Sequence, residues 1–305
     1  MGTYRYIHKD SRLFDEQKQF YEKNGYLLIK NNVDEELMNK VCQRFVDFCN
    51  GKVIDINVVT VMKDPSLKDK GVHGEYVINK IQDFLYDDVF WEYACNKAVI
   101  DIVEGIIGPN ITGAHSMFIN KPPNADPGAS LHPLHQDLHY FPFRPADKIV
   151  ASWTALERVD ERNGCLYVIP GTHQGPLYKH EYPKGYKNAL YHGIQGFDHL
   201  PKIYVPMDRG DTVFFHPLIL HGSGPNFTKQ AYQMGFRKAI SCHYADSKDT
   251  YFIDVKGTYQ ENIAKEIEEI ASRKGAHLSF VEIWKAKSRL VKGLPGSFQN
   301  LESHL

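Results

Sequence analysis

Three consecutive residues near the middle of the chain, His135, Gln136 and Asp137, include two potential metal ligands. On an extended strand, residues i and i+2 point to the same face, so His135 and Asp137 could both reach one metal ion. A histidine from another strand would complete the two-histidine, one-carboxylate set that leaves coordination positions open on Fe(II). Open positions imply catalysis rather than a structural metal.

Prolines on both sides of this motif favour a strand over a helix, because proline interrupts a helix and lacks a backbone donor. His135 and His139 have the i, i+4 spacing of helical zinc proteases. However, the glutamate that would follow the first histidine is replaced by Gln136. His132 and His139 remain open as alternative ligands, although a carboxylate two residues from a histidine on a strand fits iron better.

The third ligand is expected in the segment Arg209–Gly224, which contains two histidines. His216 precedes a proline and is expected at a strand junction. His221 precedes Gly-Ser-Gly, and small residues let a ligand approach the backbone closely. We therefore favour His221, with His216 as the alternative.

A candidate anion anchor, Arg237, lies on an expected strand whose residues Ala239, Ser241 and His243 share its face. The small residues leave room for a ligand, and a guanidinium presents a planar fork that matches a carboxylate. A lone strand arginine more often reaches solvent at a sheet edge. The order His-x-Asp, His, Arg nevertheless favours a carboxylate-binding role.

The secondary structure expected along the chain changes from mainly helices to mainly strands. Helices are expected at 14–23, after a cap at Asp34, and at 96–107. From Thr112 onward, turn residues separate short apolar runs that predict strands at 112–120, 134–140, 149–157, 165–169, 203–206, 211–215, 217–221 and 235–245. Eight such strands predict a mainly β fold with flanking helices, built on a double-stranded β-helix (jelly-roll, cupin-like) core.

A single domain is expected over residues 1–305, since no shift in composition marks a boundary. It comprises a helical N-terminal part at about 14–110, the jelly-roll core at about 111–256 and C-terminal helices at about 258–292. Capping boxes at Thr258–Glu261 and Ser279–Glu282 predict where the last two helices begin. The long loop at 171–201 is expected to form a lid or a substrate wall.

The composition argues against several classes of partner. Lys plus Arg number 36 and Asp plus Glu 37, so no strong field attracts nucleic acid or an anionic membrane. The five cysteines form no CxxC pair, which suits reduced thiols inside a cell. No apolar run of about 18 residues predicts a membrane span, and no apolar leader is present, so a soluble protein is expected.

The chain resembles the phytanoyl-CoA dioxygenases (phytanoyl-CoA 2-hydroxylases), within the iron(II)- and 2-oxoglutarate-dependent oxygenases. The likeness extends from about Phe20 to Lys292. Its most specific stretches are Ile119–Pro123, His132–Pro145, Asn163–Leu166, Pro170–His173, Gly210–Pro217, His221–Gly224 and Gly235–His243.

The resemblance implies a role for each matching residue. His135, Asp137 and His221 would hold Fe(II), and Arg237 would bind the distal carboxylate of 2-oxoglutarate. Ser223 would add a hydrogen bond to that carboxylate.

The resemblance also places Lys80, Met117 and Trp153 in the cosubstrate pocket. From the residues alone, Lys80 reads as a solvated helix lysine, and Met117 and Trp153 as ordinary packing. Gln136 is expected to support the site rather than bind iron.

The implied reaction hydroxylates C2 of phytanoyl-CoA or a related 3-methyl-branched fatty acyl-CoA, while 2-oxoglutarate is converted to succinate and CO2. It belongs to fatty acid alpha-oxidation, and ascorbate is a candidate reductant. Asp137 argues against a halogenating relative, in which loss of the carboxylate leaves room for halide. Two alternatives remain open: the same chemistry on a free small molecule, and a jelly-roll binding protein or zinc cupin without turnover.

The resemblance also bears on location. Ser303-His304-Leu305 is similar to a C-terminal peroxisomal address, so a peroxisomal import receptor is an expected partner, with the cytoplasm as the alternative location. The segment Pro225–Met234 is longer than expected for the close family, which leaves acyl selectivity open.

Overall fold

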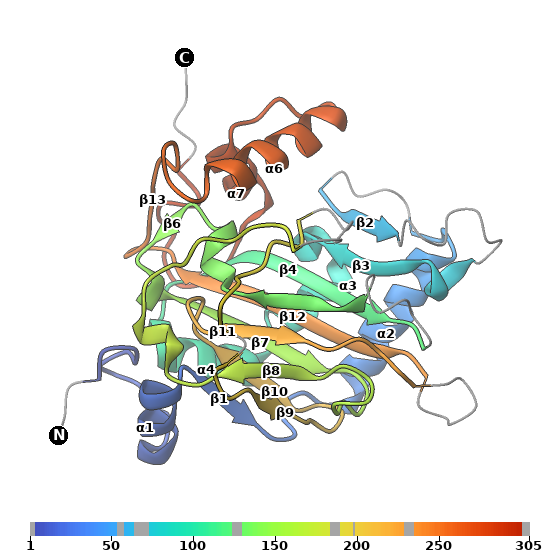
Figure 1. Cartoon of the computed structure of the whole chain (residues 1–305), viewed down its shortest axis with the longest axis horizontal. Coiled ribbons are helices and arrows are strands. Elements are labelled where there is room, and N and C mark those ends of the chain that lie inside the picture. Colours follow the sequence, from blue (N-terminus) through green and yellow to red (C-terminus); the bar gives the residue numbers. More distant parts are fainter. Residues whose placement is uncertain are drawn as a thin grey trace.

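Two antiparallel β-sheets pack face to face, with helices around them (Figure 1). The computed structural model describes residues 4–53, 58–63, 73–123, 130–183, 190–197, 199–228 and 235–300. The tripeptide Ser303–Leu305 and most of the segment Pro225–Met234 lie outside these residues.

The larger sheet gathers strands from the beginning, middle and end of the chain. Its order is β1 (Tyr26–Ile29), β10 (Thr212–Phe215), β7 (Ile149–Ala155), β12 (Arg237–Asp246), β4 (Ile111–Lys121), β3 (Ile78–Gln82) and β2 (Thr60–Lys63), with β14 (Arg289–Lys292) also paired to β4. Because strands outside residues 111–256 join this sheet, the arrangement supports the single domain that we propose.

The smaller sheet has the order β5 (His132–His135), β11 (Leu220–Ser223), β8 (Leu166–Ile169) and β9 (Ile203–Val205). A separate pair joins β13 (Tyr251–Phe252) to β6 (Phe143–Arg144). The two facing antiparallel sheets confirm the predicted jelly-roll core.

Side chains on β7 alternate between two cores, because successive residues of a strand point to opposite faces. Trp153 and Ala155 pack with Leu166 and Val168 of β8, so they fill the space between the sheets. Val150 joins the cluster on the other face, which the helices cover. The strand is therefore buried on both sides along its whole length, and its polar residues Ser152 and Thr154 share a buried contact with the Tyr93 hydroxyl.

The helices are α1 (Asp15–Asn24), α2 (Glu35–Cys49), α3 (Asp88–Ala94), α4 (Lys97–Ile107), α6 (Glu261–Arg273) and α7 (Phe280–Lys287). Short 3-10 helices are η2 (Gly74–Tyr76), η3 (Phe84–Tyr86), η4 (Asp137–Tyr140), η5 (Ala146–Lys148) and η6 (Thr172–Gln174).

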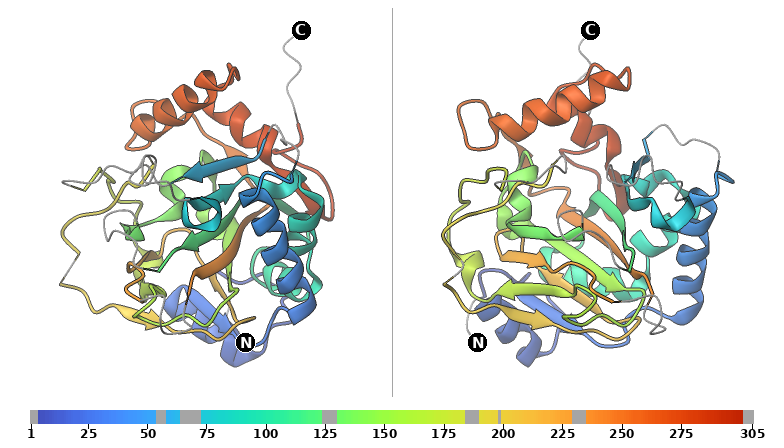
Figure 2. Two further views of the ribbon diagram at one scale, coloured as in Figure 1. Left: turned by 90° about the vertical axis from the view of Figure 1, so that its right-hand side faces the viewer. Right: turned by 45° about the vertical axis from the view of Figure 1, so that its right-hand side comes forward.

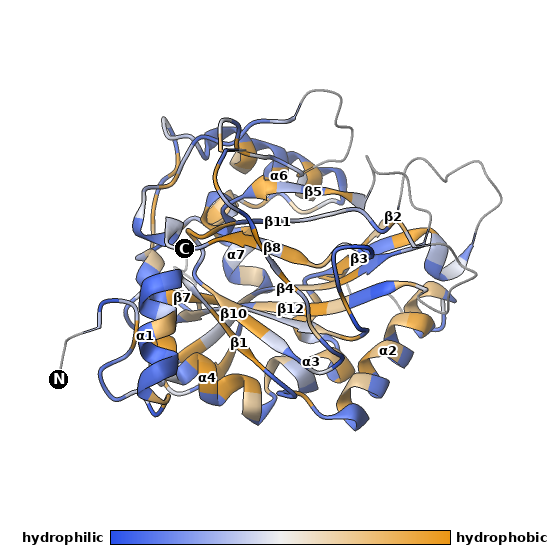
Figure 3. Cartoon of the chain, turned by 60° about the horizontal axis from the view of Figure 1, so that its bottom comes forward, coloured by the Kyte–Doolittle hydropathy of each residue, from blue (hydrophilic) through white to orange (hydrophobic). Residues whose placement is uncertain are grey.

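Helix α2 begins and packs as its sequence predicts. The Asp34 carboxylate accepts a hydrogen bond from the Leu37 amide at 2.9 Å and so caps the first turn. Leu37, Val41 and Phe45 share one buried face, and Phe45 stacks on Phe118 of β4 with ring centres 4.3 Å apart. Figure 3 shows the hydrophobic and hydrophilic residues of α2 in separate bands.

Helices α6 and α7 lie together at one end of the molecule, whereas α1 and α2 lie elsewhere around the sheets (Figure 2). The capping box predicted at Ser279 and Glu282 is confirmed at the start of α7. The capping box predicted at Thr258 is wrong: the Thr258 hydroxyl donates to the carbonyl of Val255, and α6 begins only at Glu261.

Two strand predictions need correction. The strand expected at 134–140 ends at His135, because the chain turns into η4 from Asp137 onward. The strand expected at 217–221 lies at Leu220–Ser223, since Pro217 has no amide hydrogen and Ile219 instead donates to His216 in a turn.

All five cysteines are free thiols. Among the described helices, none has the length and apolar content that a membrane-spanning segment needs.

Candidate functional site

Strand pairing brings the metal-ligand candidates together. His221 on β11 lies directly opposite His135 on β5. Asp137 follows β5 at the first residue of η4, and its Oδ1 lies 3.3 Å from His135 Nε2 and 3.6 Å from His221 Nε2. One ligand atom from each residue lies within 4.8 Å of the other two. Ligand atoms sharing a metal at about 2.1 Å lie roughly 3 Å apart, so a small inward movement would close the site.

Backbone carbonyls orient both histidines toward this point. His135 Nδ1 lies 2.8 Å from the carbonyl oxygen of Pro133, and His221 Nδ1 lies 3.1 Å from that of Ile219. An Nδ1–H that donates to a carbonyl leaves the Nε2 lone pair free for a metal. Burial also lowers the pKa of His221 to about 4, which favours the neutral, metal-binding form.

The carboxylate of Asp137 has a partner of its own. His243 on β12 places Nε2 2.8 Å from Asp137 Oδ2, which leaves Oδ1 beside the two ligand histidines. Burial alone would favour the neutral acid, but the neighbouring imidazoles of His221, His243 and His135 outweigh it. The pKa of Asp137 is therefore held well below its usual value, and the group is an anion.

The rival histidines make other contacts. His216 pairs with Asp147 at 3.4 Å, away from the triad. His139 stacks on His180 and contacts His192. His132 stacks on His135 but is not in the ligand cluster found among the described residues.

Gln136 points away from both of its neighbours and ties three segments together. Its amide nitrogen donates to the carbonyls of Pro176 and Leu218, and its amide oxygen accepts from the Tyr178 backbone. This arrangement agrees with the supporting role expected for Gln136.

Arg237 is 1% exposed and has unused donors. One terminal nitrogen donates to the Gly164 carbonyl at 2.8 Å, and the guanidinium carbon lies 5.3 Å from the centre of the Trp153 ring. Nε and the other terminal nitrogen have no partner in the described part of the chain. Burial lowers the pKa of Arg237 to about 10, so it stays charged at neutral pH. A buried cation with free donors is suited to a carboxylate ligand.

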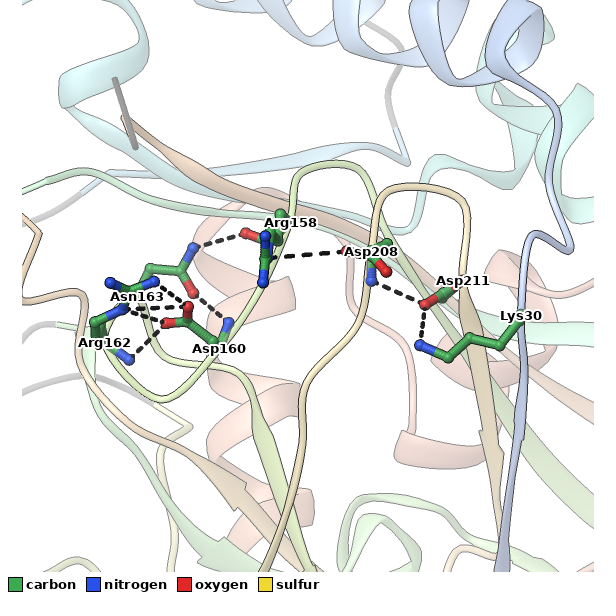
Figure 4. A network of polar contacts seen from close by, with 7 residues as sticks. All are labelled: Lys30, Arg158, Asp160, Arg162, Asn163, Asp208 and Asp211. Atoms are coloured by element: carbon green, nitrogen blue, oxygen red, sulfur yellow. Dashed lines mark hydrogen bonds and ion pairs between the residues drawn. The ribbon is translucent and has the colours of Figure 1, made fainter. Parts of the chain in front are cut away.

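The turn that precedes Gly164 is held by contacts among Arg158, Asp160 and Asn163 (Figure 4). Asn163 accepts from the Asp160 amide at 2.8 Å and donates to the Arg158 carbonyl at 2.8 Å. The Asp160 carboxylate in turn pairs with Arg162. These contacts hold the turn that presents the acceptor for Arg237.

The other residues expected to line the cosubstrate pocket lie on the two sheets of the sandwich. Three are on the inner face of the larger sheet, and Ser223 is on β11 of the smaller sheet. Met117 and Trp153 flank Ser241 on neighbouring strands, and Ser223 lies two residues beyond His221. Lys80 is on strand β3 and only 5% exposed, not a solvated helix lysine; its Nζ lies 4.9 Å from the centre of the Tyr191 ring.

A cavity of about 360 Å³ adjoins the triad. His135 and Asp137 line it together with Lys80, Met117 and Tyr191. Its other walls include aliphatic side chains from β2, α6, the connection between α6 and α7, α7 and the loop at 171–201, namely Met62, Leu190, Ile267, Ile270, Ala271, Leu278 and Ile283.

A buried ion pair holds α7 against the sheet at the side of this cavity. Lys287 Nζ lies 3.1 Å from Asp83 Oδ1, which also contacts His115 Nδ1 at 3.0 Å. Burial opposes ionisation of Asp83, but Lys287 and His115 lower its pKa to about 2. The contact crosses more than 200 residues of sequence, so no local pattern predicts it.

Sequence reasoning missed two further residues at the site. The even spacing between Arg237 and His243 placed the two residues on one face of the strand, as the structure shows. His243 had no predicted function, however. Lys121 lies opposite Arg237 in the β4–β12 register, where only the pairing of two distant strands reveals it.

The residues present fit iron and 2-oxoglutarate. The triad offers two imidazoles and one carboxylate, the ligand set typical of Fe(II) sites with open positions. Arg237 lies on β12, in the sheet that faces β5 and β11. Its two nitrogens without partners in the described part of the chain are available to a second anionic group.

Comparison with known proteins agrees with this geometry. The family model described as phytanoyl-CoA dioxygenase (PhyH) matches residues 21–234. The "Probable phytanoyl-CoA dioxygenase" of Caenorhabditis elegans is 48% identical, over 96% of this chain and 97% of that protein. The "Phytanoyl-CoA dioxygenase, peroxisomal" of Rattus norvegicus is 48% identical and that of Homo sapiens 46%, each over 95% of this chain and 86% of the relative.

Solved structures share the fold at low sequence identity. EctD from S. alaskensis with bound Fe has a TM-score of 0.61 at 14% identity and covers 80% of this chain and 82% of its own. The epimerase SnoN in complex with Fe3+, alpha ketoglutarate and nogalamycin RO has a TM-score of 0.60 at 17% identity, over 81% and 88% of the two chains. The chain therefore belongs to the phytanoyl-CoA dioxygenase family of 2-oxoglutarate-dependent dioxygenases.

Proposed function

We propose that this enzyme hydroxylates C2 of a 3-methyl-branched fatty acyl-CoA, with phytanoyl-CoA as the reference substrate. The balanced reaction consumes the acyl-CoA, 2-oxoglutarate and O2, and releases the 2-hydroxyacyl-CoA, succinate and CO2. The single observation that carries the proposal is the cavity, which is bounded by His135 and Asp137 at one side and has a wall of aliphatic side chains from α6 and α7. The names of the relatives supply the substrate class.

The assignment of roles follows from the contacts. His135, Asp137 and His221 hold Fe(II), which, with 2-oxoglutarate and O2, supplies the oxidising power for C–H hydroxylation. His243 fixes the orientation of Asp137. His135, Asp137, His221 and His243 are all buried, so water is excluded from the site. The exclusion of water strengthens the interactions between charged groups there.

The cosubstrate is oriented from its distal end. Arg237 donates to the distal carboxylate of 2-oxoglutarate, and Ser223 adds a hydroxyl donor. Trp153 packs against the Arg237 guanidinium and so limits its movement. Lys80 and Met117 line the cavity beside His135 and Asp137.

The substrate is held mainly by burial of its hydrocarbon chain. Each CH2 group removed from water contributes about 0.8 kcal/mol, so a long chain supplies much of the binding free energy. Ile267, Ile270 and Ala271 on α6, with Ile283 on α7, offer the corresponding apolar wall. A small polar substrate would leave this wall without a partner.

Location and reductant belong to the same proposal. The mammalian relatives that carry "peroxisomal" in their names support a peroxisomal enzyme of fatty acid alpha-oxidation. The tripeptide Ser303–Leu305 is the proposed import signal, and ascorbate is the proposed agent that keeps the iron reduced.

The test is succinate release by anaerobically iron-loaded protein with a panel of acyl donors. The panel compares phytanoyl-CoA, a straight-chain acyl-CoA of similar length, free phytanic acid and small free acids or amino acids. We expect succinate and a 2-hydroxylated product from phytanoyl-CoA, and little from the free acids. Strict dependence on a small free substrate would instead establish the alternative oxygenase. Zinc in the purified protein together with no substrate-dependent succinate would indicate a binding protein.

A further inference from the structure

Lys121 is a buried cation beside Arg237. It ends β4 directly opposite Arg237 on β12 and is 6% exposed. Its Nζ donates to the hydroxyl oxygen of Ser223 at 2.7 Å and to the carbonyl oxygen of Gly224 at 2.6 Å. Both acceptors are neutral, and no described carboxylate forms an ion pair with Lys121.

Two cations in one buried site are costly without an anion. Burial, followed by repulsion from Arg237 and Lys80, lowers the pKa of Lys121 well below its usual value. Arg237 meanwhile keeps two nitrogens without partners in the described part of the chain. A carboxylate placed here would offset the desolvation of both cations, as it does in a buried ion pair.

The contact with Lys121 also determines what Ser223 can do. Lys121 Nζ donates to Ser223 Oγ, and once a bound carboxylate favours the charged amine, that amine has three donors and no acceptor. The hydroxyl hydrogen of Ser223 is then directed elsewhere, and it can donate to an anion.

The backbone brings the two cations together through Gly164. Its φ is +85°, and a Cβ at this position would lie 2.3 Å from the Gly224 carbonyl oxygen. Gly164 therefore allows its own carbonyl, which accepts from Arg237, to lie beside the carbonyl that accepts from Lys121. A side chain at this residue would separate the two cation anchors.

We propose that Lys121 is a positioning residue for the distal carboxylate of 2-oxoglutarate. It holds the Ser223 hydroxyl as a donor and supplies a second positive charge beside Arg237. This inference rests on the proposed function, because it takes 2-oxoglutarate as the ligand, and it adds a residue to the set named above.

The test compares two ligands that differ only in the distal carboxylate. Binding of 2-oxoglutarate and of 2-oxopentanoate to the anaerobic iron-loaded protein is measured by calorimetry, without acyl substrate. We expect Lys121→Met to weaken 2-oxoglutarate binding roughly 10-fold or more, and 2-oxopentanoate binding less than about 2-fold, since the charge of Lys121 and the Ser223 donor that it positions act only on the distal carboxylate. Lys121→Arg should restore part of the difference.

The matched control is Lys238→Met on the adjacent position of β12. Lys238 pairs with Glu75 at 2.6 Å and lies on the opposite face of the strand from Arg237. We expect this variant to bind both ligands as the wild type does.

Lys121→Arg provides a second route if Lys121→Met folds poorly, and Ser223→Ala tests how Lys121 acts. If Lys121 acts through Ser223, the losses in 2-oxoglutarate affinity should be less than additive in the double variant. Equal weakening of both ligands by Lys121→Met would reduce Lys121 to a structural residue, and unchanged affinity for both would remove it from the site. A wild-type protein that binds neither ligand would contradict the proposed function itself.

Discussion

His243 orients Asp137 through a hydrogen bond between His243 Nε2 and Asp137 Oδ2, at 2.8 Å. The other carboxylate oxygen is thereby left beside His135 and His221. A long strand of the larger sheet thus controls a ligand that lies in a short 3-10 turn after the smaller sheet.

Replacing His243 should loosen the metal site. We expect His243→Leu to weaken Fe(II) binding by about 10- to 100-fold, as is usual when the partner of a ligating side chain is removed. His243→Gln keeps a donor and should retain most of the affinity. Anaerobic metal titration of the three proteins measures the effect; equal affinity in the Leu variant and the wild type would contradict the orienting role.

Narrowing the cavity at α6 should shift chain-length preference. Ala271 lines the cavity, whereas its neighbour Ser272 is exposed. We expect Ala271→Trp to lower kcat/KM for phytanoyl-CoA by about 10-fold or more, since an indole would occupy space that the chain needs. Turnover of a short 3-methyl acyl-CoA should fall much less.

Ser272→Trp is the matched control, because it adds the same side chain on the outer face of α6. We expect its ratio of long-chain to short-chain turnover to equal that of the wild type. An unchanged ratio in Ala271→Trp as well would place the hydrocarbon chain elsewhere.

Gln260 should contribute strongly to stability. Its side-chain amide donates to the carbonyls of Leu138, His139 and Phe141 at 2.9–3.0 Å, which joins the start of α6 to the segment after Asp137. We expect Gln260→Leu to lower the free energy of unfolding by about 3 kcal/mol, because buried carbonyls lose their donor. Urea denaturation tests this, with the exposed Gln43→Leu as a control near zero.

His173 should make stability depend on pH. It is 1% exposed and packs against the Tyr6 and His216 rings, and burial, followed by repulsion from His216, lowers its pKa to about 4. Between pH 6.5 and 4 the unfolded chain binds more protons at this residue, so stability falls as the pH falls through that window.

The variant His173→Gln keeps a donor for the Glu22 carbonyl but does not titrate. We expect its loss of unfolding free energy from pH 6.5 to 4 to be smaller than that of the wild type by about 2 kcal/mol. Exposed His277→Gln should match the wild type. Identical pH profiles for His173→Gln and the wild type would exclude His173 as a source of the dependence.

The fold could be predicted because its signals are local. Apolar runs separated by turn residues located β4, β7, β8, β9, β10 and β12, and Asp34 and Ser279 marked helix starts correctly. The strand after His135 was overextended, since the turn at Asp137 is held by Gln260, a residue more than 100 positions away.

The residues of the site likewise divide into those that a local signal indicates and those that only the pairing of distant strands reveals. His135 and Asp137 were proposed from their spacing, and His221 was preferred to His216 because of its small neighbours; the structure brings these three side chains together. The link from His243 to Asp137 and the contact of Lys121 with Ser223 span 106 and 102 residues, so only strand pairing brings them together. The spacing pattern of one segment carries no signal for such contacts.

The most direct test of the central claim is the fate of 18O2 during turnover of phytanoyl-CoA by the iron-loaded enzyme. We predict one 18O atom in succinate and one in a hydroxyl at C2 of the acyl chain, with both products absent from the His135→Ala variant. Labelled succinate without labelled 2-hydroxyphytanoyl-CoA would contradict the substrate assignment. No labelled succinate from the wild type would contradict the oxygenase mechanism built on His135, Asp137 and His221.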